Sequence, residues 1–413
     1  MISYLSFYPD RFKLHRLFMI FLLPVLTGCH QSKLENALQL AGTNRFELER
    51  VLAYYSQDPS ESLKLKAAIF LIENMPGHIS YTGPVIDSYY EQTDRILNSN
   101  LSPQEKSEQF DLIDAMHPDL RNYVVEDVKI IKADFLIKNI DQAHEDWRGK
   151  RMLRHVSFDQ FCEFMLPYKI DELQALDCWR DSLRGKYSTR YREAPASNLH
   201  ASSVWYAAHL INEQINDTFS QYHHQGKSHH FLKASQIDKI AFGECKDFCN
   251  LATAILRSEG LPVSKESFPH RGNRPYGHSW FSVLDNNGTL LPFYWGIGSI
   301  PGGAFFPDDR IPKVYRNSWS KNPKADRYLK SCRNVPIHVD VFKKDVTAEY
   351  TSVSHITIPV LHGYKKAQWA YIAVFDNQDW MVVDFGEIKK GKARFETWDG
   401  ELLISYSGTM ERN

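Results

Sequence analysis

The residues best suited to chemistry in this 413-residue chain are Cys245 and His278. Cys245 follows Gly243 and opens an amphipathic stretch, which predicts a helix over 245–258 with Gly260 as its C-cap. The N-terminus of a helix presents unpaired N–H groups and the positive end of the helix dipole, and both favour a thiolate over a thiol. We therefore expect the pKa of Cys245 to be depressed and its sulfur to act as a nucleophile.

A thiol nucleophile needs a base, and His278 is the candidate. It lies in the segment Gly277-His-Ser-Trp280, at the start of a strand predicted over 279–284. An imidazole can take the proton from the thiol and later give it to a leaving amine. The N–H groups at the start of the Cys245 helix can bind the oxyanion that forms on attack. The chemistry that this pair indicates is acyl transfer.

The order and spacing of these segments resemble the transglutaminase-like (papain-like) cysteine superfamily. The likeness covers roughly residues 200–300 and includes Arg257, Gly260 and Pro262 at the end of the helix. It implies a papain-like fold with Cys245 as nucleophile and His278 as base. It also implies a peptide or glutamine amide as substrate, with hydrolysis ahead of cross-linking, and no metal or organic cofactor.

One position departs from the family pattern. Members with a full triad carry an Asp on the next strand, and in this chain that position falls at or next to Tyr294. A tyrosine hydroxyl can bond to the imidazole but does not stabilise imidazolium as a carboxylate does. Asp285, Asp308 and Asp309 are alternatives from loops. Loss of the orienting Asp costs a known triad about 10⁴-fold in turnover, so an enzyme and an inactive binding module both stay open.

The remaining cysteines of the six in the chain point to packing or pairing. Cys249 lies one turn beyond Cys245, where a disulfide between the two is disfavoured, and we expect it in the core. Cys162 and Cys178 flank Pro167, and either a disulfide or packing between helices fits them.

The N-terminus reads as a secretion signal. Basic residues (Arg11, Lys13, Arg16) precede an apolar run, 17–26, which is too short to span a bilayer. The run ends in Leu26-Thr-Gly-Cys29, which resembles the lipobox of bacterial lipoproteins and implies a lipid on Cys29. We expect residues 1–28 to be a signal peptide, and the protein to be anchored in the bacterial cell envelope, in the periplasm or at the surface.

Composition excludes some classes of function. The chain has a formal net charge of -1, and removing the three basic and one acidic residues of the signal changes it to about -3. This near-neutral balance provides no electrostatic footprint for nucleic acid. The expected partners are a peptide or protein substrate and, through Cys29, the membrane.

The pattern along the chain predicts an α+β protein. We expect a helical region over 29–198, a transglutaminase-like domain over 199–340 and a C-terminal β-sandwich over 341–413. The chain stops soon after Tyr406, so we expect the last sheet of the sandwich to be incomplete. Helical spacing is the basis of the predicted helices: Leu34–Ala41, Phe46–Leu52, Leu65–Ile72, Val125–Trp147, Phe158–Met165 and Val204–Ile215. Turn-bounded apolar runs are the basis of the predicted strands: Ser279–Leu284, Thr289–Tyr294, Ile356–Ile358, Ala370–Phe375, Trp380–Phe385 and Leu402–Tyr406.

Two further features belong to this picture. The segments 73–76, 166–168 and 179–180 resemble the helical regions of large transglutaminase-like lipoproteins of gut-type Bacteroidetes. Four histidines over 223–230 could bind zinc, but no cysteine or carboxylate spacing supports a closed site, and a solvated loop is expected there.

Overall fold

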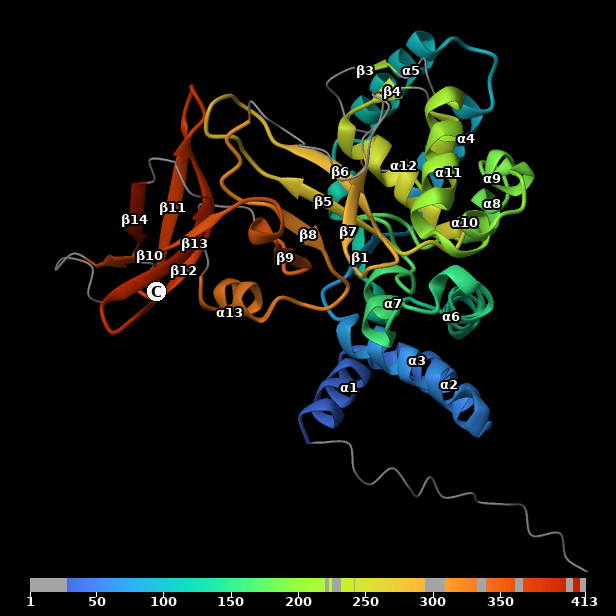
Figure 1. Cartoon of the computed structure of the whole chain (residues 1–413), viewed down its shortest axis with the longest axis horizontal. Coiled ribbons are helices and arrows are strands. Elements are labelled where there is room, and N and C mark those ends of the chain that lie inside the picture. Colours follow the sequence, from blue (N-terminus) through green and yellow to red (C-terminus); the bar gives the residue numbers. More distant parts are fainter. Residues whose placement is uncertain are drawn as a thin grey trace, which may run out of the picture.

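The computed structural model describes residues 28–219, 223–224, 232–240, 242–293, 309–332, 339–360, 367–398 and 404–408. Side chains are not described at residues 28–32, 223–224, 242 and 404–408. The described residues form an α+β protein, which confirms the predicted class. Helices dominate the first half of the chain, and an antiparallel sheet closes it (Figure 1).

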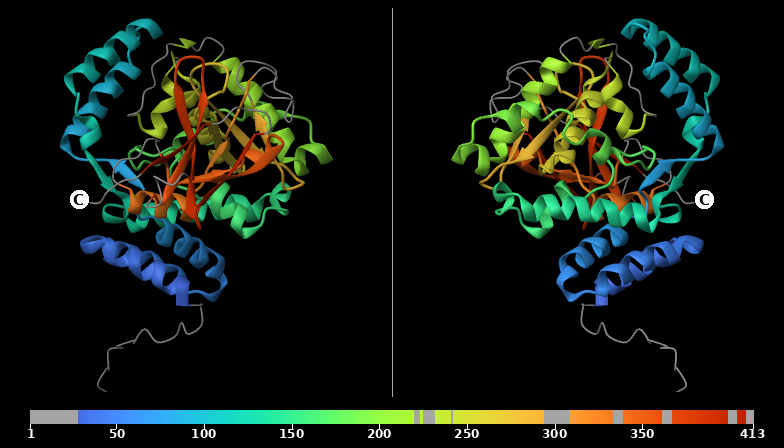
Figure 2. Two further views of the ribbon diagram at one scale, coloured as in Figure 1. Left: turned by 90° about the vertical axis from the view of Figure 1, so that its left-hand side faces the viewer. Right: turned by 90° about the vertical axis from the view of Figure 1, so that its right-hand side faces the viewer.

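The N-terminal region is helical, as predicted. Its helices are α1 Gly28–Leu40, α2 Arg45–Ser56, α3 Ser62–Asn74, α4 Pro84–Leu97, α5 Pro103–Met116, α6 Ala133–Gly149, α7 Phe158–Phe164, α8 Trp179–Leu183, α9 Thr189–Glu193 and α10 Asn198–Ser202. Short 3₁₀ segments join them: η1 Gly42–Asn44, η2 Pro59–Glu61, η3 Leu120–Asn122, η4 Asp127–Lys129 and η5 Arg151–Leu153. In Figure 2, α1 to α3 lie beneath the rest of the molecule, and the α4–α5 hairpin stands at its side.

One predicted helix begins later than expected. The stretch predicted as helical from Val125 starts with strand β2, Val124–Glu126, and η4 before α6 begins at Ala133. β2 pairs with β1, Ile79–Tyr81, in a small antiparallel sheet. The partner strand lies far away in the sequence, so the pairing overrides a local helical pattern that alone would have extended α6.

The central part combines helices with a five-stranded antiparallel sheet. α11 spans Val204–Thr218 and α12 spans Cys245–Ser258. The sheet has the order β7-β6-β5-β8-β9, with β5 Val263–Phe268, β6 His278–Leu284, β7 Leu290–Phe293, β8 Tyr315–Asn317 and β9 Lys343–Asp345. A parallel pair (β3 His223–His224 and β4 Phe242–Gly243), η6 Ala234–Lys239 and α13 Pro323–Ser331 complete it.

Both faces of β6 are covered. Phe281 and Val283 join the main core, together with Phe248 and Ile255 of α12. Trp280, on the alternate face, lies in a separate cluster with Phe268 of β5. The main core also includes residues of α1 to α3 and α6 to α8. One continuous core therefore joins the helical region to the central part, across the boundary expected between residues 198 and 199.

The C-terminal region is a five-stranded antiparallel sheet. Its strands, in the order β10-β13-β12-β11-β14, are β10 Val353–Pro359, β11 Trp369–Phe375, β12 Trp380–Lys389, β13 Lys392–Trp398 and β14 Ile404–Gly408, preceded by η7 Thr347–Glu349. β12 and β13 pair only beside their connecting turn, at 388–389 with 392–393. Phe395 of β13 and Ile372 of β11 belong to the same hydrophobic cluster. The predicted β-rich C-terminal region is confirmed, and its described strands form one antiparallel sheet.

Candidate functional site

Cys245 is the first residue of α12, at the predicted boundary. Glu244 is the N-cap, and a capping box joins it to Asp247: the Asp247 carboxylate accepts from the Glu244 N–H at 3.0 Å. Gly243 has a φ of 145°, which a side chain disfavours. The glycine and the capping box therefore fix where the helix starts, and with it the place of the sulfur.

The motif residues Arg257 and Gly260 lie at the other end of α12. Gly260 has a φ of 67°, and a Cβ there would lie 2.4 Å from the Asp146 side chain. The buried Arg257 donates from Nη2 to the Val263 carbonyl at 2.8 Å, where β5 begins. Arg180 in turn donates to the Arg257 carbonyl at 2.9 Å. These contacts give the helix-end motif a structural purpose, which is to join α12 to β5 and to the helical region.

His278 is the first residue of β6, one position before the predicted strand start. Its partner across β5 is Phe268, and the two rings lie 6.1 Å apart. Trp280, two residues on, is buried, and its indole N–H donates to Glu266 at 3.0 Å. The Trp of the His-x-Trp segment therefore anchors the start of the strand that carries the histidine.

The loop before His278 is tightly held. At Gly277 a Cβ would lie 2.3 Å from the Phe268 carbonyl oxygen, so only glycine fits. Arg271 donates from Nη1 to the Tyr276 carbonyl at 2.8 Å, and its Nε lies 2.7 Å from the Asp309 carboxylate. The backbone that leads to His278 is thus fixed by contacts on both sides.

The structure brings the Cys245 sulfur to the start of β6. The Leu284 N–H donates to Pro262 beside β5, and the next N–H, of Asp285, donates to Thr289 beside β7. Because N–H groups alternate along a strand, the N–H of Ser279 points to the β7 side. There it is close enough to the Cys245 thiol to act on its pKa, which it lowers. The nucleophile candidate therefore lies against the residue that follows His278.

The prediction of a depressed pKa for Cys245 is wrong. Burial raises the pKa of the thiol, and the charges of Glu244 and Asp247 raise it further. The backbone N–H groups of Ser279 and Lys246 act in the opposite direction but do not outweigh burial. Two acidic residues thus oppose the helix N-terminus on which the prediction rested.

Two of the alternative carboxylates are engaged elsewhere. Asp285 closes the β6–β7 turn by accepting from the N–H groups of Asn287 and Thr289, each at 2.9 Å. It lies at the far end of β6, about 20 Å along the strand from His278. Asp309 is buried and pairs with Arg271 and Arg274. Tyr294 and Asp308 lie outside the described residues.

A charged cluster beside the first turn of α12 was missed at the level of sequence. Asp171, in the loop between α7 and α8, binds Lys246 at 3.1 Å and Lys265 of β5 at 2.7 Å. Lys265 also donates to Asn250 at 2.9 Å. Burial would raise the pKa of Asp171, but the two ammonium groups hold it well below its usual range. No local pattern around Asp171 signals partners so distant in the chain.

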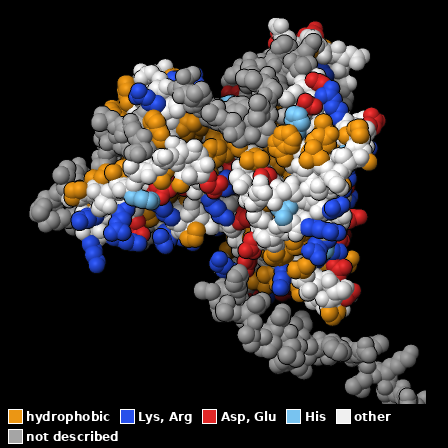
Figure 3. Space-filling view, in the orientation of Figure 1, with side chains coloured by type: hydrophobic (Ala, Val, Ile, Leu, Met, Phe, Trp, Pro, Cys, Tyr) orange, Lys and Arg blue, Asp and Glu red, His pale blue; other side chains and the backbone are white. Residues whose placement is uncertain are grey.

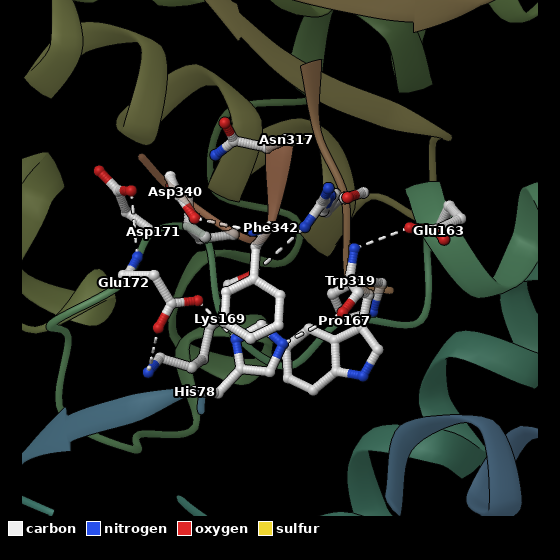
Figure 4. Close-up of a pocket in the computed structure, with 13 residues that line it drawn as sticks. His78, Glu163, Pro167, Lys169, Asp171, Glu172, Asn317, Trp319, Asp340 and Phe342 are labelled. Carbon is white, nitrogen blue, oxygen red and sulfur yellow. Dashed lines mark hydrogen bonds and ion pairs between the residues drawn. The ribbon is translucent and has the colours of Figure 1, made fainter. Parts of the chain in front are cut away.

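Next to this cluster a pocket separates the helical region from β8 and β9 (Figure 4). The His78 ring is stacked between Trp319, at 3.9 Å, and Phe342, at 3.5 Å. Its Nδ1 lies 2.5 Å from Glu172, and its Nε2 lies 3.2 Å from the Trp319 carbonyl. With a volume of about 40 Å³ the pocket has room for water but not for a substrate.

The other expected site features have these outcomes. Cys162, Cys178, Cys245, Cys249 and Cys332 are free thiols, with Cys162 and Cys249 buried and Cys178 exposed. Within the described ranges no three His, Cys, Asp or Glu side chains are grouped as metal ligands. Of the histidine-rich segment, only the backbone of His223 and His224 is described, and it forms β3 instead of a loop.

Cys29 lies, by its backbone, in the first turn of α1. Its side chain is outside the described residues. No helix in the part of the chain that the structure describes is long and apolar enough to cross a bilayer.

Comparison with known proteins finds no match to this chain among family models, curated proteins or solved structures.

Proposed function

We propose that this chain is a thiol-dependent amidase or peptidase of the transglutaminase-like class, with Cys245 as nucleophile and His278 as base. The observation that supports it best is the proximity of the Ser279 N–H to the Cys245 thiol, whose pKa it acts to lower. It unites a helix N-terminal cysteine with the strand start that carries a histidine, which is the arrangement a thiol–imidazole pair requires.

The proposed reaction has two halves. The Cys245 sulfur attacks the carbonyl carbon of an amide while His278 takes the thiol proton, and the oxyanion is held by N–H groups at the start of α12. His278 returns the proton to the leaving amine, and a thioester remains. Water then attacks the thioester as His278 takes a proton from it. The acid product leaves, and the proton returns to the sulfur.

A chloroacetamide probe tests this proposal in a Cys178→Ser, Cys332→Ser background, because Cys178 is exposed and Cys332 half-buried. We expect labelling to disappear in Cys245→Ala and to slow about 10²-fold or more in His278→Ala. Phe268→Leu, next to the histidine, is a control for simple disturbance of β6. Equal labelling with and without Cys245 would refute the proposal.

A second candidate function is a binding module that has lost catalysis. It is favoured by the raised pKa of Cys245 and by the engagement of Asp285 and Asp309 in other contacts. It predicts that Cys245→Ser and His278→Ala leave ligand binding unchanged. Hydrolysis of any peptide from a quenched-fluorescence library, lost in Cys245→Ala, would exclude it.

For location we propose a lipid anchor at Cys29 and residence in the bacterial cell envelope. The lipobox-like sequence and the apolar run before it support this proposal. Metabolic labelling with an alkyne fatty acid, followed by fractionation, tests it. Cys29→Ala should lose both the label and the membrane association, whereas Cys178→Ala should keep them.

A further inference from the structure

Three exposed aromatic side chains lie on two segments that meet beside the proposed site. Tyr276 is 77% exposed and stands two residues before His278. Phe375 and Trp380, which are 42% and 38% exposed, face each other across the β11–β12 turn with ring centroids 5.5 Å apart. Large aromatic side chains normally bury such area, so their shared exposure calls for an explanation.

A hydrogen bond joins the two segments. The side-chain amide of Asn377, in the β11–β12 turn, donates to the backbone carbonyl of Asn273, in the loop that leads to His278. Tyr276 lies three residues after Asn273, and Trp380 lies three residues after Asn377. Each Cα atom is therefore within about 11 Å of the Cα atom of the residue that makes the bond. The C-terminal β region therefore extends the surface around the proposed site.

Tyr276 is held in a conformation that costs energy. Its φ is 69°, a region that bulky residues avoid. Arg271 holds the Tyr276 carbonyl at 2.8 Å, and Asp309 holds Arg271. A fixed backbone thus directs an aromatic ring into solvent next to the candidate base, and strain of this kind is concentrated at functional sites.

We infer that Tyr276, Phe375 and Trp380 form an aromatic platform that binds a peptide segment with large apolar side chains. The inference rests on the proposed function, because the bound peptide would have to run from the platform to Cys245, where its scissile amide would lie. Besides the contact between Asn273 and Asn377 itself, the Cα atoms of Tyr276 and Trp380 are separated by at most about 22 Å, a distance that roughly seven residues of extended peptide can cover.

The geometry favours a peptide over a sugar chain. The Phe375 and Trp380 rings are inclined at 50°, which forms a notch for one side chain instead of a flat face two rings wide. The hydrophobic side chains on the face in Figure 3 lie among charged ones and do not merge into one broad apolar surface. A notch between two inclined rings suits one side chain of a peptide better than a large protein interface.

Selection of dodecapeptides from a phage library on the full-length Cys245→Ala protein tests this without turnover. We expect enrichment of Phe, Tyr, Trp and Leu, and about tenfold weaker binding of the best peptide by Tyr276→Ala and Trp380→Ala. Tyr276→Phe should retain binding. Tyr54→Ala, which removes a similarly exposed ring from α2, is the matched control and should bind as the parent does.

Several results would overturn the inference. They are a selection without apolar enrichment, equal affinity in parent and platform variants, or chitohexaose binding that Tyr276→Ala abolishes. Unchanged thermal unfolding of each variant rules out misfolding as the cause of lost binding. If peptides bind the platform but the wild type cleaves none of them, the platform stands and the proposed hydrolysis fails.

Discussion

The carboxylate of Asp171 lies 3.1 Å from the ammonium group of Lys246, the residue that follows Cys245. It joins the helical region directly to the first turn of the helix that presents the thiol. Lys265 binds the same carboxylate and lies on β5, the neighbour of the strand that carries His278. One partly buried carboxylate therefore joins both elements of the proposed site.

Asp171→Asn should destabilise the fold by about 3 kcal/mol, because it leaves the buried Lys265 without its counter-charge. Burial already lowers the pKa of Lys265, so the lysine should lose its charge more readily in the variant. Urea unfolding measures the effect. Asp181→Asn breaks an exposed pair with Lys138 and should cost less than about 1 kcal/mol. Similar losses in both variants would contradict the importance given to Asp171.

The reactivity of Cys245 should rise with pH above the range of an ordinary thiol, because burial and two acidic neighbours raise its pKa. The rate of iodoacetamide modification, followed on the Cys245 peptide by mass spectrometry, gives the midpoint, which we expect above 9. Glu244→Gln keeps the N-cap but removes a charge, so it should move the midpoint down. Glu213→Gln, on α11, should not move it. A midpoint near 7 in the unmodified protein would contradict this reading.

The local elements of the site were predictable from the sequence. The bounds of α12 were predicted correctly because Gly243 and Gly260 mark its ends with short-range signals. The β6–β7 hairpin was predicted because Asp285 to Gly288 suits a tight turn, and Gly288 indeed has a φ of 80°.

The features that depend on distant partners were not predictable. Strand β13 and strand β5 were missed because charged residues interrupt their apolar alternation, and only pairing with neighbours defines them. Asp171 gave no signal because its partners, Lys246 and Lys265, are far away in the chain. The raised pKa of Cys245 was missed although Glu244 and Asp247 stand in the motif itself. The prediction weighed the helix dipole and left out their charges and the burial.

The His78–Glu172 pair should make stability depend on acidity. Burial would raise the pKa of Glu172, but the charges of His78 and Lys169 and the hydrogen bonds from His78 and the Ile79 N–H lower it to about 2, from an ordinary 4.5. A carboxyl group with a depressed pKa stabilises the fold above its unfolded pKa, and that contribution is lost as the pH falls from 4.5 toward 2. At most it is about 3 kcal/mol.

Glu172→Gln tests this dependence through the free energy of unfolding between pH 6 and pH 2.5. The variant should be less stable at pH 6, and the gap to the wild type should close as the pH falls. Glu91→Gln, in an exposed pair with Arg95, is the control and should show no such convergence. Parallel curves for the wild type and Glu172→Gln would show that Glu172 does not titrate in the way its surroundings imply.

Gly277→Ala should displace the start of β6. An added Cβ would lie 2.3 Å from the Phe268 carbonyl oxygen and 2.5 Å from that of Pro269, and backbone atoms cannot move away cheaply. Crowding of this kind costs about 1 to 3 kcal/mol. The shift would also move His278 relative to Cys245, and a misplacement of about 1 Å can reduce a rate by 10²-fold.

Gly149→Ala provides the matched comparison, because nothing lies within 4 Å of the added methyl group and the residue ends α6. It should leave stability unchanged or raise it by up to about 1 kcal/mol. Gly277→Ala should show slower chloroacetamide labelling of Cys245 and a lower free energy of unfolding in urea than Gly149→Ala. If Gly277→Ala labels and unfolds as Gly149→Ala does, the loop before His278 is more adaptable than its contacts with Phe268 and Pro269 imply. The proposed dependence of the thiol–imidazole pair on this loop would then be wrong.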